Sequence, residues 1–182
     1  MGRSFAMVVI FQEALNMLKY ASWVHGNALV EELPQGILKR HWAWGTELQF
    51  IFGPGESPVG TWCHLPIPTP VILNDSRLKV QTLFLLFKTG QHAAIDNLHV
   101  FDGPNKVHGW DIVPGSNMSA RRSGDHSRSI DAQNTFTLPT PHELAFGLSI
   151  AFTFRPVAVN TSLPQVDPEG TLLITTAGAD FF

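Results

Sequence analysis

The segment Glu143 to Phe154, which reads ELAFGLSIAFTF, constrains the fold of this chain more than any other. Large apolar and small side chains alternate along it, the period of a β-strand that turns one face to a core. We expect one strand here, with a face buried between two layers: Leu144, Phe146, Leu148, Ile150, Phe152 and Phe154. The opposite face, from Ala145 to Thr153, carries small side chains and permits close approach of a second layer, a ligand or another subunit.

Other segments repeat this strand signal. RLKVQTLFLLF predicts a strand with Leu78, Val80, Thr82, Phe84 and Leu86 on one side. Further strands are expected at Ser22–Val30, Thr46–Phe52, Thr61–His64, Ala94–Phe101, Lys106–Val113, Thr135–Leu138 and Leu172–Thr176, which makes about nine in all. With 13 Pro and 15 Gly marking turns between them, the pattern predicts an all-β fold, an antiparallel β-sandwich of the jelly-roll kind.

The first twenty residues have a helical period instead. Polar Gln12, Glu13, Asn16 and Lys19 face away from Val8, Phe11, Leu15 and Leu18, which predicts an amphipathic helix that packs on the domain or on a partner subunit. We therefore expect a helical extension over residues 1–20 and a single β-sandwich domain over residues 21–182. The apolar run is too short to cross a bilayer and is not followed by a signal-peptide cleavage site, so a soluble cytoplasmic protein without membrane contact is expected.

The charge and the cysteine content limit which binding partners and which redox compartment the sequence is compatible with. The net charge is −3 and no basic run exceeds two residues, which argues against nucleic-acid binding. Cys63 is the only cysteine, so no disulfide can form within the chain and a reducing compartment is compatible. We expect its thiol to be buried and inert.

Six sequence blocks occur in a specific order between Ala21 and Phe181: ASWVHGN, GTWCHLPIPTPVIL, LHVFDG, GDHS, AFGLSIAFTF and TTAGADF. In these blocks the chain resembles a family of short, mostly uncharacterised all-β microbial proteins. The resemblance implies a single β-sandwich domain and no particular activity. The first twenty residues lie outside it.

Histidines beside turn-forming or aromatic residues are the candidate catalytic groups. They are His25, His64, His99 and His126, and imidazole is the side chain that most readily moves protons near neutral pH. Asp102 and Asp125 are the expected partners, because a carboxylate can orient an imidazole. Alternatively, each histidine is a separately satisfied interior or turn residue.

Cofactor and metal motifs are missing from the sequence. It contains no H-E-x-x-H, no paired cysteines and no G-x-S-x-G, and GPGESPVG lacks the lysine of a phosphate loop. We expect neither a metal nor a cofactor, although ligands from separate strands could still be brought together.

The five tryptophans are either core residues or the wall of a binding site: Trp23, Trp42, Trp44, Trp62 and Trp110. An indole offers a flat face to a ring-shaped ligand and an N–H group as a donor. HWAWG places Trp42 and Trp44 on the same side of an extended segment, as in a platform. Trp62 and His64 share a face before the rigid PIPTP segment, and we expect His64 and His99 to line one cavity with Trp62, close to Asp102 or Asp125.

The stretch 115–134 is almost wholly polar, and a loop of that length is either functional or disordered. Three functions remain open. The first is binding of a small organic molecule in an aromatic, histidine-lined pocket, with metal-free acid–base catalysis of the isomerase, cyclase or lyase type if there is turnover. The second is a non-catalytic carbohydrate-binding module, and the third is a self-assembling structural protein, a homo-oligomer held by the N-terminal helix. Convergence of His25, His64 and His99 favours catalysis, an exposed Trp42–Trp44 shelf favours sugar binding, and a buried intersubunit helix favours assembly.

Overall fold

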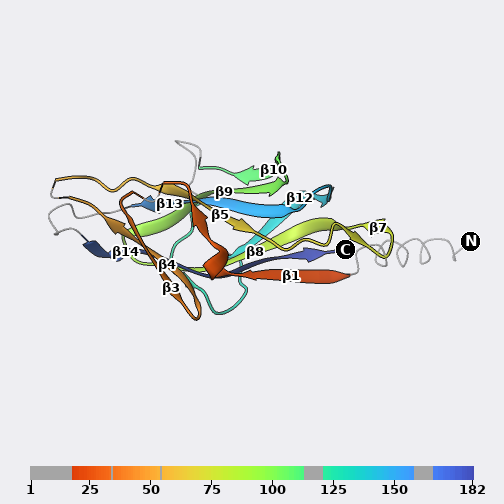
Figure 1. Ribbon diagram of the computed structural model, residues 1–182, viewed down its shortest axis with the longest axis horizontal. Coiled ribbons are helices and arrows are strands. Elements are labelled where there is room, and N and C mark those ends of the chain that lie inside the picture. The colour runs from red at the N-terminus through yellow and green to blue at the C-terminus, as the bar shows by residue number, and fades with distance from the viewer. Residues whose placement is uncertain (1–17, 34, 54, 113–120, 158–165) are drawn as a thin grey trace, which may run out of the picture.

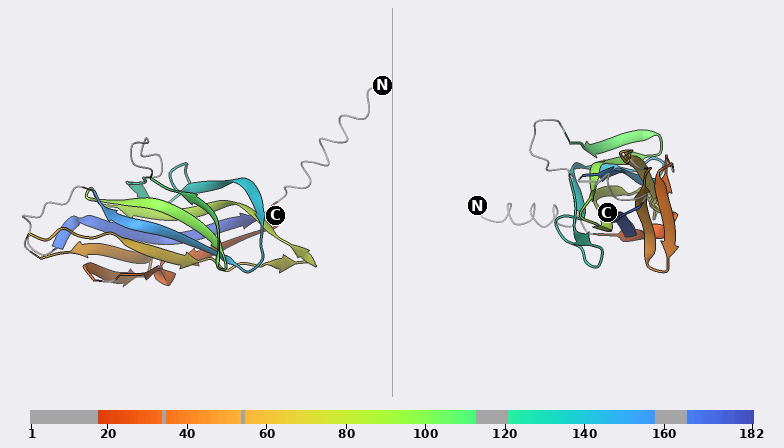
Figure 2. Two further views of the ribbon diagram at one scale, coloured as in Figure 1. Left: turned by 90° about the horizontal axis from the view of Figure 1, so that it is seen from above. Right: turned by 90° about the vertical axis from the view of Figure 1, so that its left-hand side faces the viewer.

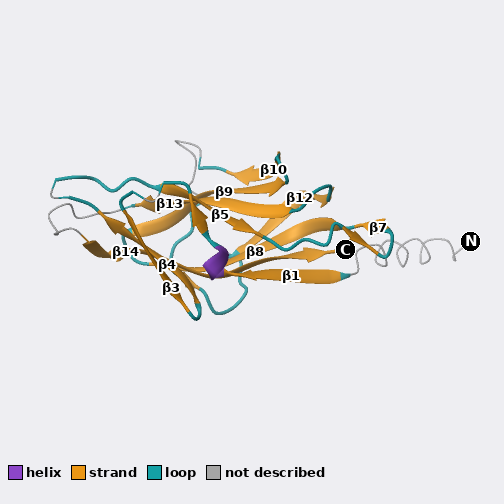
Figure 3. Cartoon of the chain, viewed as in Figure 1, coloured by secondary structure: helices purple, strands orange, loops and turns teal. Residues whose placement is uncertain are grey.

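The computed structural model (Figure 1) describes residues 18–33, 35–53, 55–112, 121–157 and 166–182. Within these ranges the chain forms fourteen strands and a single 3-10 turn, η1 (Gly26–Ala28). Strands dominate the described chain (Figure 3). The two large sheets contain β1 (Tyr20–His25), β2 (Val30–Glu31), β3 (Ile37–Trp42), β4 (Gly45–Ile51), β5 (Thr61–Pro66), β8 (Lys79–Thr89), β9 (Ala93–Asp102), β10 (Asn105–Trp110), β11 (Asp125–His126), β12 (Thr135–Glu143), β13 (Leu148–Pro156) and β14 (Val166–Phe181). A separate short pair consists of β6 (Ile72–Leu73) and β7 (Ser76–Arg77).

Two antiparallel sheets lie face to face (Figure 2). Sheet A has the order β11-β8-β14-β4-β3, with β1 also paired to β14 and β12 to β8, and sheet B has the order β10-β9-β13-β5-β2. In this arrangement β4 faces β5, β14 faces β13, β8 faces β9 and β12 faces β10. The chain passes from one sheet to the other between β4 and β5, between β5 and β8 and between β8 and β9. This connectivity is that of a jelly roll, so the all-β antiparallel prediction is confirmed.

The predicted number of strands is too low. Each of the nine predicted strands has a counterpart, but Ser22–Val30 is divided by η1 into β1 and β2, and β3, β6, β7 and β11 are additional. The sequence of β3 does not predict a strand, because Lys39, Arg40 and His41 are three consecutive polar residues and interrupt the alternation of apolar and polar side chains. The predicted N-terminal helix falls on residues 1–17 almost entirely, and these lie outside the described ranges.

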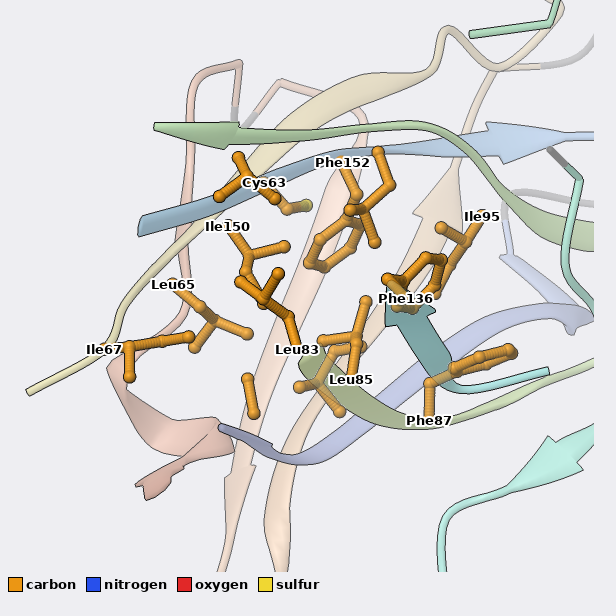
Figure 4. Packing of buried hydrophobic residues seen from close by; sticks show 14 of the residues in the cluster. Cys63, Leu65, Ile67, Leu83, Leu85, Phe87, Ile95, Phe136, Ile150 and Phe152 are labelled. Carbon is orange, nitrogen blue, oxygen red and sulfur yellow. The ribbon is translucent and has the colours of Figure 1, made fainter. Parts of the chain in front are cut away.

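The core fills the space between the two sheets (Figure 4). Phe152 and Ile150 from β13 are fully buried and lie opposite Leu83 and Leu85 from β8. Phe50 of β4 stacks on Phe154 of β13 with ring centroids 4.1 Å apart and so joins the two sheets directly. Side chains from strands far apart in the sequence thus hold the sandwich together by apolar burial.

The segment Glu143 to Phe154 is not one strand, and its predicted burial fails at Phe146. β12 ends at Glu143 and β13 begins at Leu148, so the intervening residues form a turn in which Phe146 is 65% exposed. Gly147 adopts a φ of +153° in this turn, a conformation that favours glycine. The remaining large residues of the predicted face are buried as expected.

The predicted facing of β8 is also wrong beyond Val80. Its pairing shifts register against both β12 and β14, and an extra residue at such a bulge reverses which side chains face inward. Leu83, Leu85 and Phe87 therefore belong to the core. Phe84 and Leu86 lie on the outer face of sheet A.

One edge of β14 is shared by two strands placed end to end. β4 pairs with β14 as far as Ile174, and β1 pairs with it from Thr176 onward. Two glycines permit this junction, because a Cβ at Gly26 or Gly45 would lie 2.0 or 2.1 Å from the carbonyl oxygen of Ile174. The tip of the β3–β4 hairpin is thus brought to the outer face of sheet A beside the start of η1.

Candidate functional site: a groove on the outer face of sheet A

An exposed pair of stacked indoles forms the tip of the β3–β4 hairpin. The rings of Trp42 and Trp44 are 5.3 Å apart between centroids and 3° from parallel, and the two residues are 38% and 58% exposed. Gly45 follows with a φ of +149°, which allows the tight turn that sets the rings side by side. Trp42 backs Trp44, so one indole face is supported from behind.

Hydrogen bonds from η1 fix this tip in place. His25 Nδ1 accepts from the Asn27 N–H at 3.2 Å, so His25 Nε2 carries the proton that it donates to the Ala43 carbonyl at 3.2 Å. Asn27 Nδ2 donates to the Trp42 carbonyl at 3.1 Å. Thr46 Oγ1 donates to Asn27 Oδ1 at 3.0 Å. The predicted catalytic His25 therefore positions the backbone between the two tryptophans.

Beside Trp44 lies a groove of about 460 Å³ on the outer face of sheet A. Leu173 and Thr175 of β14 contribute to its lining, and the other lining residues are Lys88, Asp125, Ser127 and Arg128. A concave surface with one aromatic wall and several convergent polar groups is a typical arrangement for a small-molecule site.

The polar wall of the groove carries both charges. Asp125 accepts from the Ser127 hydroxyl at 2.6 Å and lies 3.3 Å from the Lys88 ammonium. The Ser127 hydroxyl, with help from Lys88, holds the pKa of Asp125 below its ordinary value. Arg128 makes no ion pair with any residue that the structure describes. The groove thus presents fixed donors and acceptors for a polar ligand.

The loop that carries this wall is anchored to the sheet. Thr175 Oγ1 donates to the Ser127 carbonyl at 3.1 Å, and Asn134 Nδ2 donates to the carbonyls of His126 and Ser129 at 2.9 and 2.7 Å. His126 Nδ1 bonds Asp131 at 2.8 Å and its ring packs on Phe87. The described part of the predicted polar loop is therefore ordered, and His126 shapes the loop.

Trp62, His64 and His99 lie on the other side of the molecule, on the outer face of sheet B. The rings of Trp62 and His99 are 4.8 Å apart between centroids. His64 and His99 both pair with Ala151, so they are two strand spacings or roughly 10 Å apart. Each imidazole has its own carboxylate: His64 bonds Glu32 at 2.8 Å, and His99 bonds Asp111.

The partners predicted for these histidines are therefore wrong. Asp125 belongs to the groove on sheet A, and Asp102 is buried at 2% exposure beneath the β12–β13 turn. Asp102 accepts from the backbone N–H groups of residues 145, 146 and 147 at 2.7, 2.8 and 2.8 Å, and from His142 Nε2 at 3.1 Å. Burial raises the pKa of Asp102, but these four hydrogen bonds outweigh it and lower the pKa to about 2. Asp102 is a structural residue that closes a turn.

The two remaining tryptophans lie apart from the groove. Trp23 of β1 covers Gly178 and stacks on Phe84 with centroids 5.2 Å apart. Trp110 of β10 packs on Phe136 at 5.5 Å and belongs to the margin of the core. Among the predicted site residues, the structure brings together Trp42, Trp44 and His25 at the hairpin tip and Asp125 in the groove beside it.

Several groove residues escaped the sequence analysis. Lys88, Leu173 and Thr175 are spread over two strands and look like ordinary strand residues, so only the pairing of β8 with β14 and β11 reveals that they meet. Ser127 and Arg128 had a weak signal, because Ser127 is the last residue of the GDHS block and Arg128 follows it inside a long polar stretch.

Metal and membrane features are not found in the described ranges. No three His, Cys, Asp or Glu side chains gather there as a metal ion would require. In the same ranges, no helix is long and apolar enough to span a bilayer. Cys63 is buried, and burial raises the pKa of its thiol well above the ordinary value.

The fold and the site together define a jelly-roll β-sandwich with an open groove edged by stacked indoles. The chain belongs to a family of unknown function (DUF6623), whose model matches residues 17–166. This agrees with the predicted resemblance to an uncharacterised family. No curated protein matches the chain.

A solved structure similar to the chain is the low affinity xylan binding module CBM86 of Roseburia intestinalis. The two chains are 8% identical and superpose with a TM-score of 0.44, over 90% of this chain and 97% of that module. A likeness this distant says nothing about what the present chain binds.

Proposed function

We propose that this protein is a non-catalytic carbohydrate-binding module that holds a sugar against Trp44 in the groove on sheet A. One observation carries the proposal: an exposed indole, backed by a second and parallel indole, forms the wall of a polar groove. A ligand that binds an unsupported exposed tryptophan has to order that side chain, which costs binding free energy. The stacking of Trp44 on Trp42 orders the ring before the ligand binds, so this cost is smaller.

The chemistry of the groove suits a sugar. The C–H face of a sugar ring is apolar and can pack on an aromatic face, while its hydroxyl groups both donate and accept. Asp125 can accept and Arg128 and Lys88 can donate. The hydroxyl protons of Ser127 and Thr175 are donated to Asp125 and to the Ser127 carbonyl, so the oxygens of these hydroxyls can accept from a ligand. An apolar ligand would cover these polar groups without making hydrogen bonds to them.

The histidines give less support to catalysis. His25 is committed to the Ala43 carbonyl and lies on sheet A, whereas His64 and His99 lie on the outer face of sheet B. Convergence of the three on one cavity, the arrangement expected of an acid–base enzyme, is therefore not met. An exposed Trp42–Trp44 shelf with dispersed histidines is the arrangement expected of a sugar binder.

Affinity electrophoresis tests the proposal. Native gels would each contain one soluble polysaccharide: xylan, hydroxyethylcellulose, glucomannan or polygalacturonate. We expect at least one to retard the protein, and Trp44→Ala to weaken the interaction by about tenfold or more. Phe146→Ala is the matched control, since it also removes an exposed ring. Absence of retardation in every gel, or equal retardation of Trp44→Ala and the unmodified protein, would refute the proposal.

A second candidate function rests on the contact between Trp62 and His99. Asp111 orients His99, and this hydrogen bond to the imidazole holds the pKa of Asp111 below its ordinary value. Such a dyad beside an indole could move protons on a small organic ligand without a metal. Trp62→Ala in the same gels separates the two sites: retardation that depends on Trp62 and not on Trp44 would move the ligand to sheet B.

A further inference from the structure

A second cavity continues the Trp44 groove along β14. It measures about 450 Å³ and shares Lys88 and Leu173 with the first cavity. Glu47, Gln91, Glu169 and Thr171 are among the residues that line it. Because two residues belong to both cavities, the outer face of sheet A holds one elongated groove.

The groove is longer than a single sugar ring. Thr175 marks the Trp44 end and Glu169 the other end, and the six residue-to-residue steps between them extend over roughly 20 Å in a strand. The Ser127 carbonyl bonds Thr175 at the Trp44 end, where the loop crosses onto β14. From the Trp44 end, the second cavity extends the groove toward Glu169.

The far wall of the groove is as firmly held as the near wall. The Gly90 N–H donates to the Thr171 carbonyl at 2.9 Å, and the His92 N–H donates to the Glu169 carbonyl at 3.0 Å. A Cβ at Gly90 would lie 2.1 Å from the Glu169 carbonyl oxygen, so glycine alone permits this approach. The turn between β8 and β9 is thus fastened to β14 before any ligand arrives.

Charges along the groove are balanced. Lys88 is paired with Asp125, and Glu47 is paired with Arg40 at 3.0 Å. Arg128 at one end and Glu169 at the other add one charge of each sign. With Arg40 counted, these residues carry no net charge, so the groove favours a neutral ligand over an anionic one.

From the length of the groove, its course along β14 and its balanced charge, we infer that the groove binds a neutral oligosaccharide chain several rings long, which lies along β14 with one ring on Trp44. This inference rests on the proposed function and extends it from a sugar to a sugar chain of defined direction. Further rings of the chain occupy the part of the groove lined by Thr171, Gln91 and Glu169.

Titration with oligomers of increasing length tests the inference. The probes are cello- and xylo-oligosaccharides from monomer to hexamer, with oligogalacturonides of the same lengths for comparison, followed by tryptophan fluorescence and calorimetry. In at least one neutral series, affinity should rise about tenfold or more between the dimer and the longer oligomers, and the oligogalacturonides should bind more weakly.

Blocking the far part of the groove gives the decisive result. Thr171→Tyr fills it, and we expect the hexamer to bind this variant no better than the dimer does, with dimer affinity unchanged. Gln91→Tyr, at an exposed turn position, provides a second block should Thr171→Tyr fail to fold. Thr137→Tyr, on the exposed side of β12, is the matched control and should bind like the unmodified protein.

The two proposals fail in different ways. Binding that depends on Trp44 but does not change with oligomer length, or that is tightest for oligogalacturonides, overturns the inference and leaves the sugar site intact. Full hexamer affinity in both blocked variants overturns it as well. Absence of binding to every oligomer and polysaccharide overturns both proposals together.

Discussion

Replacing Asp102 with asparagine should destabilise the protein in a way that depends on pH. The carboxylate is buried and accepts four hydrogen bonds, three of them from the backbone of the β12–β13 turn. Asparagine has nearly the same shape, but its amide nitrogen cannot accept, so a backbone N–H in the turn would face another donor. Burial opposes the charge of Asp102, yet the hydrogen bonds lower its pKa from 3.8 to about 2.

That difference in pKa sets the size of the effect. Each pKa unit corresponds to about 1.4 kcal/mol, so ionised Asp102 contributes about 2 kcal/mol to stability. We expect Asp102→Asn to lower the free energy of unfolding by about 2–4 kcal/mol at neutral pH, since the mismatched donor adds to the loss. The contribution is fully present above the unfolded-state pKa near 4 and is lost as the pH falls through about 2.

Urea unfolding followed by tryptophan fluorescence, repeated from neutral pH down to about pH 2, measures this contribution. The gap in stability between the unmodified protein and Asp102→Asn should be constant down to about pH 4 and then narrow by about 2 kcal/mol. Asp75→Asn, at an exposed turn, is the control and should leave both the stability and its acid slope unchanged. Equal acid slopes for the unmodified protein and Asp102→Asn would refute the assignment of Asp102 as a charged structural residue.

Two further predictions concern the core and the hairpin tip. Phe152→Ala should lower the unfolding free energy by about 3–5 kcal/mol because it leaves a cavity between the sheets. Phe146→Ala should change it by less than about 0.5 kcal/mol, and similar losses from both in chemical denaturation would contradict the burial of Phe152 and the exposure of the turn at Phe146. His25→Ala should weaken sugar binding by about three- to tenfold, because the Ala43 carbonyl loses its donor and the stacked indoles lose their support. His25→Gln should restore much of that affinity in a fluorescence titration, since an amide can donate to Ala43, and an unaltered affinity in His25→Ala would exclude this positioning role.

The alternation of apolar and polar residues was enough to predict the β-sandwich. It was not enough to predict the turn at Phe146 or the bulge in β8. Alternation over Leu148–Phe154 identified the buried face of β13 correctly. It failed at Phe146, because a buried carboxylate from β9 holds Phe146 and its two neighbours in a turn. Nothing near Phe146 in the sequence reveals Asp102 as the acceptor. It failed again in β8, where a bulge reverses the facing between Val80 and Leu83.

The candidate site shows the same limit. HWAWG led to the prediction that Trp42 and Trp44 lie on one side of an extended segment. The two rings do lie side by side, but across the tip of a hairpin, because the chain turns between β3 and β4. The partners of the histidines could not be found this way, because Glu32 and Asp111 reach His64 and His99 through the fold of sheet B. Lys88 and Thr175 meet Asp125 only because β8 lies between β11 and β14.

The sharing of one β14 edge by β4 and β1 keeps the proposed binding tip out of the β14 ladder. Pairing of β4 stops at Ile174 and pairing of β1 resumes at Thr176. Trp42, Ala43 and Trp44 therefore project where the two strands meet and form no pair with β14. Substitutions, insertions or deletions in this tip can change which ligand face is met while every β14 hydrogen bond stays in place. The tip is therefore the position where such a chain can acquire a new specificity with little loss of stability.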